Sequence, residues 1–154
     1  MRVHIGGDHA AYELHHALVE HVRSTGHDVV DHGPFEYDPQ DDYPVAVLRA
    51  AKAVADEPGS LGIVLGGSGN GEQMAANKVP GIRAALAYST ELAELAREHN
   101  DAQVVSIGGR FTDVETAKLI VDTFLSTPFS EGERHVRRLE MVSTFEQDGT
   151  LPPE

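Results

Sequence analysis

The stretch Leu61-Gly-Ile-Val-Leu-Gly-Gly-Ser-Gly-Asn-Gly-Glu-Gln-Met-Ala-Ala-Asn-Lys78 decides how this chain folds. Its apolar run from Ile63 to Leu65 predicts a short buried strand. Glycines at positions 66, 67, 69 and 71 then predict a turn, and the run from Glu72 to Asn77 predicts a helix. A strand, a glycine-rich turn and a helix N-terminus together predict an anion site, because free backbone N–H groups and the helix dipole both favour negative charge there.

The carboxylate of Glu72 stands at the mouth of this turn. An anion hole beside a base is the arrangement that stabilises a developing oxyanion during proton transfer. The turn does not match a nucleotide-binding fingerprint, since it lacks G-x-G-x-x-G spacing and Lys78 lies too far from the glycines to act as a P-loop lysine. The alternative is a tight turn that binds nothing, with Glu72 placed only to complement the helix dipole.

Composition indicates an ordinary globular protein: of 154 residues, 40% are hydrophobic and 24% are charged. We expect a single domain over residues 1–148, including a C-terminal helix at about 131–146, and a flexible tail over residues 149–154. The chain has no cysteine. This excludes disulfides, thiolate metal sites and a thiol nucleophile.

The formal net charge of −13 argues against nucleic acid or an anionic membrane as a partner. No apolar run approaches membrane-spanning length, and no charged and apolar leader precedes the first strand, so we expect a cytoplasmic protein. An anionic ligand would need concentrated positive charge, and the chain has only 12 lysines and arginines. Their densest cluster is Arg134, Arg137 and Arg138.

Strands and helices alternate along the whole chain, which predicts βαβ units and a parallel, doubly wound α/β sheet. Expected strands lie near residues 2–5, 28–31, 63–65, 82–87 and 103–107. Expected helices lie near residues 10–23, 45–54, 72–77, 90–98, 114–124 and 131–146. We expect Asp8, Ser89 or Thr90, and Thr112 to cap three of these helices.

Three strands end in turns that carry polar residues: Gly6-Gly-Asp-His9, Gly66 to Glu72, and Gly108-Gly-Arg110. Ligands bind outside the carboxyl ends of parallel strands, so these turns are expected to converge at one edge of the sheet. His99 and Asn100, in an expected turn before the fifth strand, belong to the opposite edge. Either they are structural, or they serve a site that another subunit completes, and the second possibility argues for a homodimer.

The sequence resembles the ribose-5-phosphate isomerase type B family, which also contains allose-6-phosphate and galactose-6-phosphate isomerases. The likeness covers nearly the whole chain. Besides the central stretch, it rests on Gly6-Gly-Asp-His-Ala10, Asp42-Tyr-Pro44, Gly81-Ile-Arg-Ala-Ala85, Arg97-Glu-His-Asn100, and Arg134 with Arg138. The resemblance implies a three-layer α/β/α sandwich with a five-stranded, Rossmann-like parallel sheet. It also implies a homodimer, or a tetramer, whose active sites are shared between subunits.

One position departs from the pattern of many family members, which carry a cysteine base where this chain has Gly66. The chain is similar to the actinobacterial branch, in which a glutamate that matches Glu72 is the base. The resemblance therefore implies that the missing thiol moves the catalytic role to Glu72.

The resemblance implies interconversion of ribose 5-phosphate and ribulose 5-phosphate through a cis-enediolate, with no cofactor and no metal. In this mechanism Glu72 moves a proton between C2 and C1, Ser68 relays a proton between O1 and O2, and His99 opens the furanose ring. The other implied contacts are the backbone amides of Gly67, Ser68, Gly69, Asn70 and Gly71 on the enediolate oxygens, Asp8 on sugar hydroxyls, Tyr43 in the pocket, Asn100 on a sugar or enediolate oxygen, and His9, Arg110, Arg134 and Arg138 on the phosphate.

Alternatives stay open for both residues and function. Asp8 could instead serve only as a helix cap, and His99 as a turn histidine that caps a helix. The arginines could lie on a solvated helix face.

The substrate could be a six-carbon sugar phosphate, or the chain could be a non-catalytic module that binds a phosphate ligand. A base at Glu72 favours the enzyme, although whether enclosure raises its pKa more than the helix N-terminus lowers it is left open. The spacing of His15, His16 and Glu20 mimics metal ligands only by chance.

Overall fold

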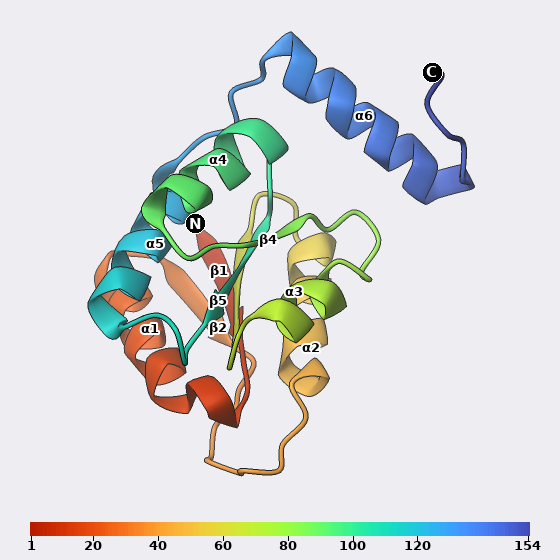
Figure 1. The fold of residues 1–154 in the computed structure, drawn as a ribbon. Helices are drawn as coiled ribbons and strands as arrows, with labels where there is room; N and C mark the ends of the chain where they lie inside the picture. The colour runs from red at the N-terminus through yellow and green to blue at the C-terminus, as the bar shows by residue number, and fades with distance from the viewer.

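A parallel sheet of five strands forms the middle layer of the computed structural model, which describes residues 1–154 (Figure 1). The strands are β1 (Arg2–Gly6), β2 (Asp28–Asp31), β3 (Leu61–Gly66), β4 (Ala84–Leu86) and β5 (Val104–Gly108). Their order across the sheet is β2-β1-β3-β5-β4, and every pair is parallel. The winding direction therefore reverses between β1 and β3, which is where doubly wound sheets bind ligands.

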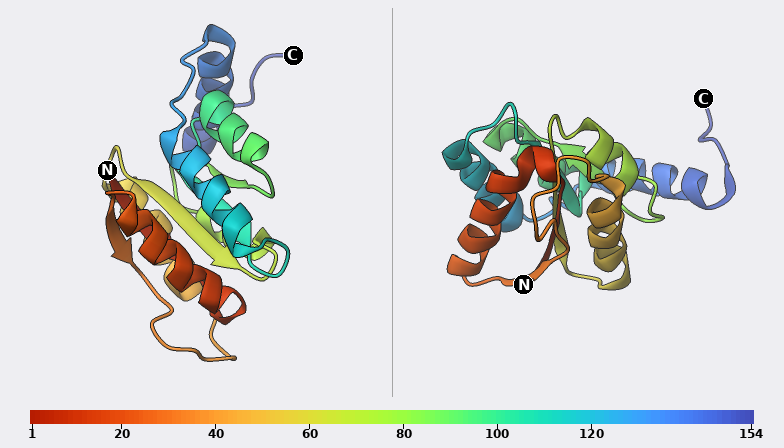
Figure 2. Two further views of the ribbon diagram at one scale, coloured as in Figure 1. Left: turned by 90° about the vertical axis from the view of Figure 1, so that its left-hand side faces the viewer. Right: turned by 90° about the horizontal axis from the view of Figure 1, so that it is seen from below.

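Helices cover both faces of this sheet, as the resemblance implied (Figures 1 and 2). The covering helices are α1 (Tyr12–Ser24), α2 (Pro44–Asp56), α3 (Asn70–Ala76), α4 (Thr90–Asn100) and α5 (Val114–Ser126), with a 3-10 turn, η1 (His9–Ala11), before α1. A last helix, α6 (Glu133–Asp148), follows them. Apolar residues of α1, α4 and α5 share one core cluster, and those of α2 and α3 share another. The three-layer α/β/α sandwich is confirmed.

Strand β3 shows how the sequence builds both cores. Ile63 and Leu65 point into the cluster under α1 and α5, whereas Val64 between them joins the cluster under α2. All three side chains are fully buried. Successive side chains of a strand point to opposite faces, so a continuous apolar run marks a strand that is covered on both sides.

Most element boundaries agree with the sequence prediction to within two residues, and the differences have local causes. Ser89 caps α4 as expected, since its side chain accepts the Leu92 N–H. Asp8 accepts the Ala10 N–H and caps the 3-10 turn η1 that begins the first helical segment, whereas α1 itself has Ala11 before its first residue and no side-chain cap. The prediction of Thr112 as the cap of α5 was wrong. The cap is Asp113, whose carboxylate accepts the Thr116 N–H at 2.9 Å.

The fourth strand is shorter than predicted, and the fourth helix is longer. Helix α4 runs through Asn100, so His99 and Asn100 lie in its last turn and not in a loop. Asp101 ends the helix in a left-handed conformation with a φ of 44°. The change places the His99 side chain on a helix end, where it contacts α6.

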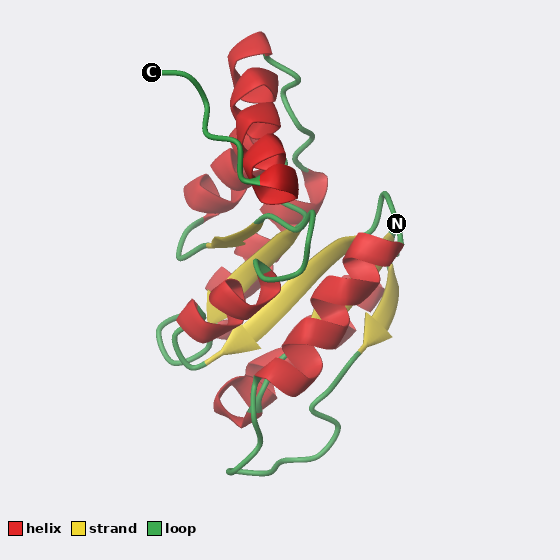
Figure 3. Cartoon of the chain, turned by 90° about the vertical axis from the view of Figure 1, so that its right-hand side faces the viewer, coloured by secondary structure: helices red, strands yellow, loops and turns green.

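Helix α6 stands away from the sheet, at the end opposite to the arrowheads of the strands (Figures 1 and 3). Only His135 is buried along its length. Met141, Val142 and Phe145 are 39%, 59% and 51% exposed, so α6 presents apolar side chains to its surroundings. Across the whole chain, no helix combines the length and the apolar character that crossing a membrane requires.

Candidate active site

The glycine-rich turn after β3 forms a cradle of backbone amides at the switch point of the sheet. The amides of Gly67, Ser68 and Gly71 donate to no acceptor within the protein. Gly69 takes a φ of +84°, which brings the chain round into α3 and which an L side chain rarely adopts. Free N–H groups at a helix start attract negative charge, so the cradle suits an anionic ligand or a developing oxyanion.

Two hydroxyl groups from neighbouring strands hold the cradle in shape. Ser106 on β5 is fully buried and donates to the carbonyl oxygen of Gly69 at 2.7 Å. The hydroxyl of Tyr88, after β4, donates to the carbonyl oxygen of Ser68. These bonds satisfy two carbonyls on the far side of the turn, and the free amides are thereby fixed in direction.

The side chain of Glu72 is only 4% exposed although it is a carboxylate. Burial raises the pKa of Glu72, and the nearby Asp8 carboxylate raises it further. The backbone N–H groups of Glu72 itself and of Gly69 oppose that shift, but burial prevails. The question that the sequence left open is thus answered in favour of enclosure, and a carboxylate of this kind is a stronger base than an exposed one.

Gly66 is the position that makes room for this carboxylate. A Cβ atom built on Gly66 would lie 1.9 Å from Oε1 of Glu72 and 2.6 Å from Oε2. No side chain at position 66 fits beside Glu72 in this rotamer. The glycine and the glutamate are therefore a matched pair, which gives a physical reason for the departure noted in the sequence.

Asp8 lies at the end of β1, next to the cradle, and is 7% exposed. Its Oδ1 accepts the Ala10 N–H at 2.9 Å, so Asp8 acts as a cap. Its Oδ2 remains for another partner. Burial raises the pKa of Asp8. Two buried carboxylates thus face the same region, Asp8 from the turn after β1 and Glu72 from the first turn of α3.

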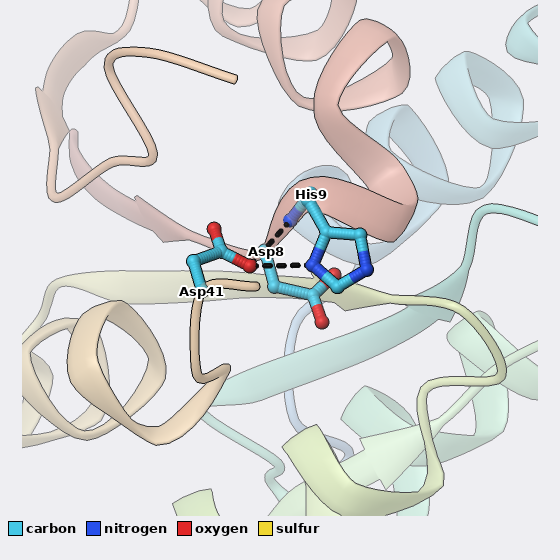
Figure 4. Close-up of side chains that lie close together, drawn as sticks. All are labelled: Asp8, His9 and Asp41. Carbon is cyan, nitrogen blue, oxygen red and sulfur yellow. Dashed lines mark hydrogen bonds and ion pairs between the residues drawn. The ribbon is translucent and has the colours of Figure 1, made fainter. Parts of the chain in front are cut away.

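His9, Arg110 and Tyr43 complete this side of the site. The guanidinium group of Arg110 lies over Gly67, since a Cβ there would be 3.2 Å from Nη1. The ring of Tyr43 packs on the backbone of Gly71, where a Cβ would be 2.8 Å from Cζ. His9 bonds to Asp41 through Nδ1 at 2.6 Å (Figure 4). The hydrogen bond that His9 donates to Asp41 raises the pKa of His9, which favours the cationic ring.

Asp8, His9 and Asp41 have ligand atoms within 4.8 Å of one another, a spacing that also suits a cation. One oxygen of each carboxylate and Nδ1 of His9 are already engaged, however. Oδ1 of Asp41 accepts two hydrogen bonds from His9, and Asp8 Oδ1 accepts one from Ala10. A cation bound to Asp41 Oδ1 would break the His9–Asp41 bond, and it would lie near the positive charge of Arg110, whose field reaches both Asp8 and His9. The groups fit a hydrogen-bonded array better than a metal site.

The remaining predicted residues lie elsewhere. His99 and Asn100 lie at the end of α4, and Arg134 and Arg138 lie on α6, at the edge of the sheet opposite to the cradle. The rings of His99 and His135 are 4.3 Å apart, and Arg134 Nε is 3.2 Å from His135 Nε2. Both arginines are exposed. A single chain therefore holds two separate groups, the cradle and a cationic group at the α4–α6 junction.

Sequence reasoning missed four residues that shape these groups: Asp41, Tyr88, Ser106 and His135. Two of them had a signal, since Asp41 directly precedes the Asp42-Tyr-Pro44 motif and His135 lies between Arg134 and Arg138. Tyr88 and Ser106 had none, because a single hydroxyl at the end of a strand is common. Burial and the partner atom reveal their roles only in three dimensions.

The fold and the site define a class: an α/β protein that offers an anion a cradle of amides and sets a buried base beside it. The sequence model of the Ribose/Galactose Isomerase family matches residues 3–142, and the chain belongs to this family. The ribose-5-phosphate isomerase B of Mycobacterium tuberculosis is 54% identical over 153 residues, covering 99% of this chain and 94% of the relative. That of Escherichia coli K12 is 38% identical over 146 residues, covering 95% of this chain and 97% of the relative.

Solved structures agree with this assignment. The type B ribose 5-phosphate isomerase of Trypanosoma cruzi is 43% identical and matches with a TM-score of 0.91, covering 97% of this chain and 98% of that one. The ribose-5-phosphate isomerase B of Mycoplasma genitalium, solved with bound ribulose-5-phosphate, is 38% identical with a TM-score of 0.91, covering 96% of this chain and 97% of that one. The resemblance read from the sequence is confirmed.

Proposed function

We propose that this protein interconverts D-ribose 5-phosphate and D-ribulose 5-phosphate through a cis-enediolate, without a metal. The observation that carries the proposal is the buried Glu72 carboxylate, with its raised pKa, beside backbone amides that have no acceptor. Glu72 takes the proton from C2 of the open-chain aldose and returns it to C1. Ser68 passes the O2 hydroxyl proton to O1, so the aldehyde becomes an alcohol and C2 becomes the ketone.

The cradle stabilises the intermediate between these two transfers. Negative charge develops on the enediolate oxygens, and the free amides of the turn, those of Gly67, Ser68 and Gly71, donate to it. Preorganised donors in a site with little water are worth more than the same donors in solution, because they need no reorganisation as charge develops. This electrostatic stabilisation replaces the Lewis acid that a metal would supply, since the amides face the oxygens that carry the charge.

The group at the α4–α6 junction supplies the rest of the site from a second subunit. We propose a homodimer, or a tetramer built from two such dimers, in which each cradle meets the partner's end of α4 and α6. His99 opens the furanose ring, Asp8 forms hydrogen bonds with sugar hydroxyls, and Asn100 binds a sugar or enediolate oxygen. The exposed apolar residues Met141, Val142 and Phe145 on α6 support this assembly, because a helix with so little buried surface needs a partner.

The phosphate lies between the two groups. His9 and Arg110 approach it from the cradle side, and Arg134 and Arg138, one helical turn apart, approach it from α6 of the second subunit. A chain with a formal net charge of −13 needs local positive charge to bind an anion. These four cations provide it at the place where the phosphate dianion binds. We place the reaction in the cytoplasm, since a charged sugar phosphate does not cross a lipid bilayer unaided.

The test is turnover of ribose 5-phosphate and of ribulose 5-phosphate by the purified protein, with and without a chelator, beside allose 6-phosphate. Pentose phosphate turnover that resists the chelator is the expected result. Turnover of the hexose phosphate alone would keep the mechanism and replace the substrate. Loss of turnover with the chelator would overturn the metal-free mechanism, and binding of phosphate ligands without any turnover would leave a non-catalytic module.

A further inference from the structure

Asp41 lies on the loop between β2 and α2, and it is tied to the turn after β1. Its Oδ1 accepts two hydrogen bonds from one residue: one from the backbone N–H of His9 at 3.1 Å and one from Nδ1 of the His9 ring at 2.6 Å (Figure 4). Both side chains are about three-quarters covered, at 25% and 22% exposure. A single carboxylate oxygen thus fixes both the backbone and the ring of His9.

This double contact decides which ring nitrogen is free. The backbone N–H can only donate, so an acceptor must stand at that point, and Nδ1 must then carry a hydrogen to bond to the same oxygen. Nε2 remains for a ligand. With Nδ1 protonated, Nε2 can donate to a phosphate oxygen only when the ring also carries its second proton.

We infer that Asp41 is a positioning residue, which holds the His9 ring by Nδ1 so that Nε2 faces the substrate phosphate as a hydrogen-bond donor. The inference rests on the proposed function, in which His9 binds the phosphate. Asp41 also favours the cationic ring by its charge. Three charged groups face His9: Asp8 and Asp41 raise its pKa, and Arg110 lowers it. The ring of Tyr37 also faces His9 in an edge-on arrangement, with the two ring centroids 6.5 Å apart.

The sign of the pH effect follows from these contacts. The ring is cationic below its folded pKa, and Asp41 moves that pKa upwards. Phosphate binding by His9 therefore persists to a higher pH than an unassisted histidine would allow, and it weakens as the pH rises through the folded pKa. Removing the charge of Asp41 shifts that weakening to lower pH without touching the base Glu72.

The experiment compares Asp41→Asn, Asp41→Ala and the matched control Glu36→Gln across about pH 6 to 9, a range that brackets histidine titration. Glu36 is an exposed acid on the same loop with no hydrogen-bond partner. KM and kcat for ribose 5-phosphate are measured, with inhibition by inorganic phosphate, and the His9 ring is titrated by NMR in the free protein.

Asp41→Asn keeps an oxygen for both bonds and loses only the charge. Its KM should match wild type at about pH 6 and exceed it by roughly five- to tenfold at about pH 8, the scale of one charge-assisted hydrogen bond, with kcat little changed. Asp41→Ala loses the orientation as well, so its KM should be raised at every pH. Glu36→Gln should follow wild type, and the NMR midpoint of His9 should fall in both Asp41 variants.

Three results would overturn the inference. The first is an unchanged His9 midpoint in Asp41→Asn. The second is a KM raised equally at all pH values in that variant, which is what mere support of the loop would give. The third is activation of wild type by a divalent cation that Asp41→Asn abolishes, which would make the cluster a metal site. If wild type does not convert ribose 5-phosphate, the proposed function fails instead, and the NMR titration still tests the hold of Asp41 on His9.

Discussion

The two ends of the sheet are built in opposite ways. At the carboxyl ends of the strands, Glu72 and Asp8 are almost wholly buried, and the cradle is braced by Ser106. At the other end, Arg134 and Arg138 are exposed on a helix that buries only His135. The first region is finished within one chain. The second carries cations and apolar side chains that are largely exposed, which is why we propose that a second subunit covers it.

The proposed function gives the two regions different tasks. A general base must be desolvated and held in one place, and a fold can achieve that only by packing around it. Phosphate-binding arginines need reach and charge, and they gain their partner only when the ligand arrives. In the proposed dimer, sharing the site between subunits would let each region meet its own requirement, and the proposal predicts that variants of the two regions behave differently.

The largest expected effect comes from removing the base. Glu72→Gln should lower kcat by roughly 10²–10⁴-fold while KM changes little, because the general base acts on the transition state and the amide keeps the shape of the side chain. Steady-state kinetics with ribose 5-phosphate give both constants. Glu91→Gln is the matched control, since Glu91 is also an acid in the first turn of a helix but is exposed. A Glu72→Gln variant with near-normal kcat would remove Glu72 from the role.

The second effect tests the fit between Gly66 and the base. Gly66→Ala places a methyl group 1.9 Å from the present position of Glu72 Oε1, so the carboxylate must move. A displacement of about 1 Å can cost about 10²-fold in rate, and we expect a loss of kcat of that order. The double variant with Glu72→Gln should be no worse than Glu72→Gln alone, because both changes act through one group. Additive losses would mean that Gly66 serves the site in another way.

Mixing variants of the two regions tests whether the site is shared. Glu72→Gln and His99→Asn should each be nearly inactive alone. In a dimer formed from one chain of each kind, one of the two sites has an intact Glu72 and an intact His99. Random association of equal amounts after mild dissociation should therefore restore about a quarter of wild-type activity. Activity that stays at the level of the separate variants would show that each site lies within one chain.

The sequence predicted much of this arrangement, for reasons that can be stated residue by residue. Strand β3 was predictable because Ile63 to Leu65 form a continuous apolar run, and the cradle because glycines precede a helix start. The separation of His99 from Glu72 followed from chain order alone, since one precedes a parallel strand and the other follows one. These features depend on local pattern and on topology, which a single sequence carries.

The remainder depends on distances that no local pattern sets. The pKa of Glu72 turns on a balance between burial and backbone amides, and only packing decides it. Asp41 and His9 meet across 32 positions of the chain. Thr112 and Asp113 are both plausible caps in the sequence, and in the structure it is the carboxylate of Asp113 that caps α5. The roles of the predicted site residues stay predictions, which the variants above address.

The smallest effect concerns stability, and it should appear only in the buried region. The folded pKa of Glu72 is raised by burial, so the unfolded chain releases this proton at a lower pH than the folded one. Ionisation therefore favours the unfolded state as the pH rises from the unfolded to the folded pKa, and the cost is constant above that window. Glu72→Gln removes the cost, because an amide does not ionise.

Glu72→Gln should accordingly match wild type in acid and unfold at a Tm higher by a few degrees at neutral pH, since about 1 kcal/mol corresponds to roughly 2–4 °C in a chain of this size. Thermal unfolding at a series of pH values measures the difference, with Glu91→Gln expected to show none. The same substitution would then lower activity and raise stability, which is the signature of a charge held in a place that the fold alone does not favour. A Tm difference that did not change with pH would mean that shape, and not the proton, separates the two proteins.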